Sequence, residues 1–97
     1  MNYILDNDGN AVPCADILTW GKWMETADRH VAVTERGDVK ISTVFLGLDH
    51  SFDGTPVLWE TMIFGGEHDQ EMDRYASKED AIKGHAAMVE LVTHDLP

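Results

Sequence analysis

The sequence is poor in cysteine, proline, aromatic residues and positive charge. Its 97 residues contain one Cys, three Pro and 8% aromatic residues, and no apolar run approaches the roughly 18 residues of a membrane-spanning helix. The single cysteine, Cys14, cannot form a disulfide within the chain, which favours a reducing compartment. The first residues, MNYILDNDGN, also lack the basic and apolar regions of a signal peptide. We therefore expect a cytoplasmic protein.

Positive charge is scarce relative to negative charge. Seven Lys and Arg stand against 18 Asp and Glu, so the net charge is −11 at pH 7 with neutral histidines. Clustered cations are needed to bind the phosphates of nucleic acids and the surface of anionic membranes, and this balance argues against both as direct partners. The 43% of hydrophobic residues supports a folded core, and the length fits a single acidic domain, 1–97.

Hydrophobic periodicity predicts an α+β fold. We expect an antiparallel sheet of about four to six strands with two helices, at 15–27 and 78–93, packed on one face as a single pair of layers. The strands are expected at 3–5, 11–12, 30–35, 39–48, 57–64 and 74–76. The strands at 39–48 and 57–64 are apolar on both faces, as is typical of central strands that are covered on both sides. The residues expected in the core include Trp20, Phe45, Leu46, Ile63, Ile82 and Val89.

The segment from Asp49 to Glu60 has the spacing of an EF-hand calcium loop. Oxygen-bearing residues stand at positions 1, 3 and 5, a glycine at position 6 and Glu60 at position 12. An EF-hand also requires flanking helices, and both flanks here have the pattern of strands. The favoured interpretation is therefore a hairpin loop. Asp49, Asp53 and Glu60 are the candidate metal ligands under the alternative, and neither a metal nor another cofactor is expected.

Glu60 and two histidines form a second candidate site. Glu60 shares a strand face with apolar residues, and His85 lies on the apolar face of the second helix. We expect the two side chains to meet across the sheet–helix interface, with His50 at the rim. Such a cluster can be a buried hydrogen bond, a Zn²⁺ site or the acid–base pair of a hydrolase. The hydrogen bond is favoured, and no catalytic residue is assigned.

Aromatic and acidic residues are candidates for protein binding. Trp23 and Trp59 are candidate anchors, because tryptophan is enriched among the residues that dominate binding energy. Four acidic residues alternate along one predicted loop: Glu67, Asp69, Glu71 and Asp73. They either form a solvated surface or an acidic patch that docks on a basic groove of another protein.

Three stretches carry a resemblance to known sequences: STVFLGLDH, WETMIFGG and the segment that runs from Arg74-Tyr75 to Gly84-His85. Over about residues 2–92 the sequence resembles a group of small proteins that are encoded in bacteriophage and prophage genomes and have no established activity. The resemblance implies expression in the bacterial cytoplasm. Small acidic phage proteins often act on host machinery, including the inhibition of CRISPR and other defence systems.

Three classes of function follow as alternatives. The favoured class is a non-catalytic phage accessory protein that binds a host protein with a basic surface and inhibits a defence system such as CRISPR; such a protein is compatible with a homodimer. A small metal-binding protein or hydrolase would use His50, Glu60 and His85. A protein that sequesters a small ligand such as a nucleotide would need a local basic pocket. The residues available for that pocket are Lys22, Arg29, Lys40 and Arg74.

Overall fold

The structure, a computed structural model, describes the whole chain except residues 50, 52–53 and 96–97. Its helices and strands are, in order, β1 (Tyr3–Leu5), β2 (Ala11–Pro13), α1 (Ile17–Thr26), β3 (His30–Arg36), β4 (Val39–Phe45), β5 (Trp59–Phe64), β6 (Met72–Tyr75) and α2 (Lys78–Asp95). The predicted α+β class is confirmed, and both helices lie within two residues of their predicted limits. Within this described part of the chain, no helix combines the length and the apolar character that a membrane crossing requires.

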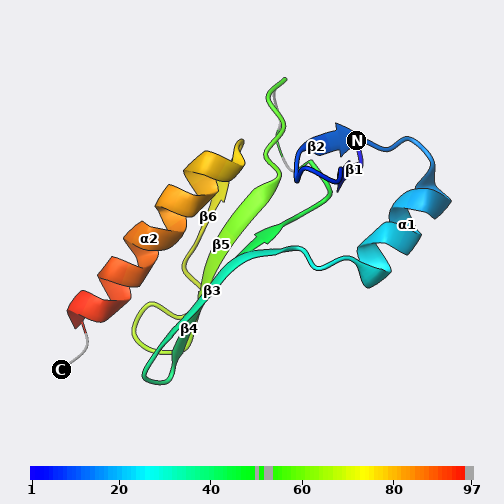
Figure 1. The fold of residues 1–97 in the computed structure, drawn as a ribbon. Helices are drawn as coiled ribbons and strands as arrows, with labels where there is room; N and C mark the ends of the chain where they lie inside the picture. Colours follow the sequence, from blue (N-terminus) through cyan, green and yellow to red (C-terminus); the bar gives the residue numbers. More distant parts are fainter. Residues whose placement is uncertain (50, 52–53, 96–97) are drawn as a thin grey trace.

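Two sheets organise the molecule (Figure 1). β1 and β2 form a two-stranded hairpin, and the other four strands form an antiparallel sheet in the order β3-β4-β5-β6. The turn between β3 and β4 has two residues, and the first, Gly37, has a φ of 59°. A left-handed residue at that position is typical of a type II′ hairpin turn, which fixes the β3–β4 register.

α2 covers one face of the four-stranded sheet (Figure 1). Side chains alternate between the faces of a strand, and the residues of β4 and β5 that point to α2 are all buried: Val39, Ile41, Thr43, Phe45, Trp59, Thr61 and Ile63. On the helix, Ala81, His85 and Val92 are buried against them. The Ser77 hydroxyl accepts a hydrogen bond from the Asp80 amide at 3.1 Å, which caps the start of α2.

α1 lies beside the β1–β2 hairpin and not over the four-stranded sheet (Figure 1). The prediction that both helices pack on one face is therefore wrong for α1. None of its residues, all of which the structure describes, is buried, and Leu18 is 75% exposed. α1 is held through its tryptophans: Trp20 Nε1 donates to the Gly47 carbonyl at 3.0 Å, and Trp23 packs edge-to-face on Phe45 at 5.8 Å between ring centroids. The 18-residue α2 already occupies the covered face of the sheet.

The predicted core is correct in part. Phe45 and Ile63 are fully buried, whereas Trp20, Leu46 and Val89 are half-buried. Ile82 is 51% exposed, so its assignment to the core is wrong. Successive helical residues differ by about 100° in direction, and the neighbouring Ala81 takes the inward position. A small side chain there lets the helix approach the sheet closely.

Candidate functional site

The four-stranded sheet has a second face, opposite the one that α2 covers. Among the described residues, no helix or strand packs on this second face. We call this surface the open face. The strand register places three rows of side chains across it: His30, Val44, Glu60 and Arg74; then Val33, Ser42, Met62 and Met72; then Glu35, Lys40 and Phe64. Three apolar members are strongly exposed, Val33 by 50%, Met72 by 46% and Phe64 by 41%. The predicted cover on both sides of β4 and β5 is therefore not provided by the described elements of this chain.

Three charged side chains of the open face, those of Arg74, Glu60 and Lys40, contact neighbouring side chains. Arg74 Nε donates to Glu60 Oε2 at 2.9 Å, and Lys40 Nζ lies 5.1 Å from the centroid of the Phe64 ring. The ion pair brings two opposite charges together, and the Phe64 ring attracts the Lys40 ammonium group, so both contacts hold charged groups close to neighbouring side chains. These contacts leave an apolar centre of valine and methionine between charged rows.

The four acidic residues of the predicted patch lie in the β5–β6 connection, which follows Phe64, and at the start of β6, and all four are exposed. We call Glu67, Asp69, Glu71 and Asp73 the acidic segment. Part of this charge also shapes the loop, because Asp69 Oδ1 accepts from the Gly65 amide at 2.6 Å and Glu71 Oε2 pairs with His68 Nδ1 at 2.9 Å. The loop part of the segment therefore borders one end of the open face with negative charge, whereas Asp73 lies opposite Thr61 in the register and points to the α2 side of the sheet.

A buried polar network joins α2 to three strands of the sheet. His85 Nε2 lies 2.8 Å from Thr34 Oγ1, and His85 Nδ1 lies 2.7 Å from Thr43 Oγ1. The Thr43 hydroxyl in turn lies 2.5 Å from that of Thr61. Burial lowers the pKa of His85, because the charged imidazolium is poorly solvated there. The network therefore holds a neutral histidine between hydroxyl groups.

The predicted contact between Glu60 and His85 is wrong. Thr61 points to α2 and bonds within the network, so its neighbour Glu60 points to the open face, where it pairs with Arg74. His50, the third predicted member, lies outside the described residues. The described part of the cluster thus consists of two separate polar contacts on opposite faces of the sheet.

The lowered pKa of His85 predicts a pH-dependent stability. Its folded-state pKa lies below its unfolded-state value of about 6.5, so as the pH falls the unfolded chain binds a proton first and stability is lost. We expect the free energy of unfolding to fall below about pH 6.5, by at most about 1.4 kcal/mol per pH unit from this group. Urea titrations at a series of pH values measure it, with His85→Gln as the non-titrating reference. Equal slopes in the two proteins between about pH 7 and pH 5 would refute the assignment.

The candidate calcium ligands are engaged separately. Asp49 Oδ1 accepts from the amides of Ser51 at 2.9 Å and Val57 at 3.0 Å, and Asp49 Oδ2 accepts from the Ser51 hydroxyl at 3.0 Å. These hydrogen bonds to the carboxylate lower the pKa of Asp49, and they fold the β4–β5 connection. Glu60 pairs with Arg74, and Asp53 lies outside the described residues. Of the residues that the structure describes, no three His, Cys, Asp or Glu form a group that could hold a metal ion.

Neither of the two candidate tryptophan anchors has the exposed side chain that was predicted for it. Trp59 is 6% exposed and packs on Phe45 with 5.4 Å between ring centroids, so its assignment as an exposed anchor is wrong. Trp23 is half-buried against the same phenylalanine. Both indoles stabilise the junction between the sheet and the N-terminal elements.

The four basic residues considered for a nucleotide pocket are used in different places. Arg29 donates to the Phe45 carbonyl at 3.0 Å, while Lys40 and Arg74 contact Phe64 and Glu60 on the open face. Lys22 is exposed on α1. The described contacts direct Arg29, Lys40 and Arg74 to three different partners and not to one common pocket. They therefore give the nucleotide interpretation no support.

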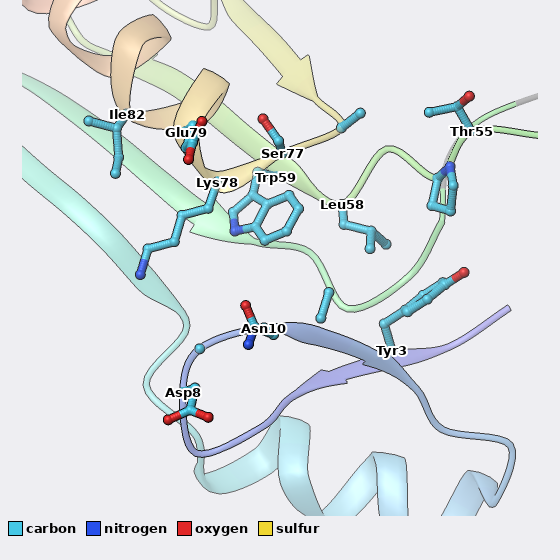
Figure 2. A pocket seen from close by; sticks show the side chains of 14 residues that line it. Tyr3, Asp8, Asn10, Thr55, Leu58, Trp59, Ser77, Lys78, Glu79 and Ile82 are labelled. Carbon is cyan, nitrogen blue, oxygen red and sulfur yellow. The ribbon is translucent and has the colours of Figure 1, made fainter.

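A cleft of about 600 Å³ separates the β1–β2 hairpin from the start of α2 (Figure 2). This volume falls within the roughly 300–1,000 Å³ of ligand sites. Figure 2 shows Tyr3 and Asn10 of the hairpin on one side, Lys78 on the other, and Leu58 and Trp59 between them. Sequence reasoning missed this cleft because its walls come from three distant segments. The cluster of polar residues at 6–10 is typical of a turn and gives no separate signal.

Comparison with known proteins adds no family: no family model, no curated protein and no solved structure matches this chain.

Proposed function

We propose that this chain is a non-catalytic binding protein, and that its open face and acidic segment together dock on a protein partner. The observation that carries the proposal is the exposure of apolar side chains on the face of the sheet that α2 does not cover. Exposed Val33, Phe64 and Met72 on the other side lose contact with water when a partner covers them. Methionine side chains are flexible and polarizable, which suits a surface that adapts to a partner.

The open face is smaller than a standard protein interface, so neighbouring residues must add to the area that a partner covers. Four strands about 4.8 Å apart, of which three have six or seven residues and β6 has four, span roughly 15 by 20 Å at most. A standard interface buries about 800 Å² on each partner, which is more than this face alone offers. The acidic segment begins three residues after Phe64, and its loop residues extend the surface at one end.

Charge specifies the partner further. At a net charge of −11, two copies of this chain repel each other, which opposes a homodimer through this surface. A partner that combines an apolar patch with Lys or Arg residues matches both parts of the surface. Its association is steered by long-range attraction and weakens as salt screens the charges.

The resemblance to phage-encoded proteins suggests the setting of this interaction. In a bacterial host cell the partner would be a host protein, and a component of a defence system such as CRISPR is the class that we propose. The resemblance alone supports this part of the proposal.

Affinity capture from a bacterial lysate with paired variants tests the acidic segment. The bait variant Glu67→Lys/Glu71→Lys reverses charge within the segment, and Asp8→Lys/Glu25→Lys makes the same change in net charge at exposed positions of the hairpin turn and α1. We expect about tenfold weaker retention of the same eluted protein by the first variant only, and loss of retention by the wild type at high ionic strength. Mass spectrometry identifies and quantifies the eluted protein.

Three outcomes would contradict the proposal. If both variants retain the partner equally and more weakly than the wild type, the total charge attracts the partner and the acidic segment does not. If both retain it as well as the wild type, the acidic segment has no part in binding. Retention that does not change with ionic strength would show that charge has no part in binding.

A further inference from the structure

A groove of about 530 Å³ runs between the outer strand β3 and the exposed side of α2. Thr34 and Arg36 of β3 line one wall, and Ala86, Val89 and Glu90 of α2 line the other. The groove therefore combines small or apolar side chains with polar and charged ones, and His85 and His94 also line it. The groove lies on the α2 side of the sheet edge and is distinct from the open face.

The outer edge of β3 carries backbone groups that are not used in the sheet. In an antiparallel pair, every second residue exchanges hydrogen bonds with the neighbouring strand. After the two-residue turn, the register directs the backbone groups of Arg36, Thr34 and Ala32 towards β4. The hydrogen bond from the Phe45 amide to the Arg29 carbonyl agrees with this alternation on the β4 side. Val33 and Glu35 therefore direct their backbone groups outward.

Three of these outward groups have no hydrogen-bond partner among the described residues. The Glu35 carbonyl accepts from Arg36 Nη1 at 2.9 Å, which leaves the Val33 amide, the Val33 carbonyl and the Glu35 amide. Unpaired groups in a row along an edge are a template for another strand. The edge is seven residues long, and its irregularity is confined to the bulge between His30 and Ala32.

We propose that an extended segment of another protein adds to the sheet as a fifth strand beside β3. Its backbone pairs with Val33 and Glu35, and every second side chain enters the groove and contacts Ala86 and Val89. The limited space between these residues favours small or β-branched side chains at those positions. This is the strand-addition mode of peptide recognition, in which backbone bonds give affinity and the groove gives selectivity.

Charge identifies the occupant as a segment of a different protein. Two copies of this chain would bring Glu35 and Glu90 of each molecule towards a second molecule that also carries a charge of −11. A segment that places a Lys or Arg on the α2 side of the groove meets Glu90 there instead, on the wall opposite Arg36. The inference rests on the proposed function only in that both require a protein partner. The two surfaces meet at Val33 and Glu35, whose side chains lie on the open face and whose backbone groups form the edge, and the groove itself lies on the α2 side.

A library of linear peptides displayed on yeast and selected on the wild-type chain tests the groove. Two pairs of variants serve as controls. Ala86→Phe fills the groove, whereas Ala87→Phe adds the same side chain at the next exposed position, which does not line it. Val33→Pro removes an outward amide without breaking a bond to β4, whereas Val33→Thr keeps the amide.

We expect selected peptides with alternating small or β-branched residues and a basic residue. A synthetic peptide of the enriched sequence should bind at least about tenfold more weakly to Ala86→Phe and Val33→Pro than to Ala87→Phe and Val33→Thr. In hydrogen–deuterium exchange, the amides of Val33 and Glu35 should exchange quickly in the free chain and slowly in the complex.

Three results would overturn the inference: no enriched peptide, equal binding by the members of each variant pair, or unchanged exchange at Val33 and Glu35. A concentration-dependent dimer in sedimentation that Ala86→Phe dissociates and Ala87→Phe does not would assign the groove to a second copy and would also overturn it. None of these results bears on Glu67 and Glu71, so the proposed function is tested separately.

Discussion

Substitution of His85 by alanine is expected to lower the free energy of unfolding by about 3 kcal/mol. The imidazole bonds to Thr34 and Thr43, and its removal leaves both hydroxyl groups without that partner. A buried polar group that loses its partner costs about 1–3 kcal/mol. The shorter side chain also leaves a cavity between α2 and the sheet, which adds to the cost. Urea denaturation followed by circular dichroism measures the change.

His94→Ala is the matched control for this prediction. His94 lies on the same helix and is exposed, so its loss should change the free energy of unfolding by no more than about 0.5 kcal/mol. A change below about 1 kcal/mol for His85→Ala would mean that the network does not stabilise the fold to the extent that its burial and hydrogen bonds indicate.

Substitution of Gly84 by alanine should destabilise the chain by about 2 kcal/mol, although alanine is the better helix former by about 1 kcal/mol. A Cβ atom at Gly84 would overlap the phenol carbon and oxygen atoms of Tyr75, whose ring lies directly against the helix. Either the ring or the helix must move, and overpacking of this kind typically costs about 1–3 kcal/mol. Thermal and urea denaturation measure the effect.

Two further variants show whether the Tyr75 ring is the cause. The Tyr75 hydroxyl is buried without a hydrogen-bond partner among the described residues, so Tyr75→Phe alone should be neutral or slightly stabilising. In a Tyr75→Ala background the space opposite Gly84 is empty, and Gly84→Ala should then stabilise by up to about 1 kcal/mol. Destabilisation by Gly84→Ala in that background would locate the clash elsewhere.

The architecture could be predicted because its signals are local. Hydrophobic periodicity, the cap at Ser77 and glycine-containing turns each act within a few residues, and they place both helices and the strands close to their observed limits. The start of α1 at Ile17 has a local cause as well. Asp16 accepts hydrogen bonds from the Leu18 amide and the Thr19 hydroxyl, so the helix begins directly after it.

The side-chain contacts could not be predicted to the same extent, because one residue of error reverses a strand face. Glu60 was expected among apolar residues that face a helix, whereas the face that meets α2 is that of Trp59 and Thr61. The sequence contains apolar residues on both faces of β5, so periodicity alone does not choose between them. The same ambiguity applies to α2, where the pattern predicts Ile82 in the core and the structure buries the neighbouring Ala81.

The candidate interfaces follow from arrangements that join distant segments. Two-sided apolar strands predict two covered faces, and only the tertiary structure shows that α2 covers one and that α1 lies elsewhere. The outward direction of the Val33 backbone groups likewise depends on the β3–β4 register and on the position of β3 at the sheet edge. These features carry no residue pattern of their own.

Methionine oxidation in the captured complex tests the proposed function most directly. Met72 lies on the open face and is 46% exposed, while Met1 is 71% exposed and does not belong to that face, so it serves as the internal reference. After brief peroxide treatment, mass spectrometry compares the two sulfoxides in the free chain and in the complex. We expect the partner to protect Met72 and to leave the oxidation of Met1 unchanged. Equal oxidation of Met72 in the free chain and in the complex would contradict docking on the open face.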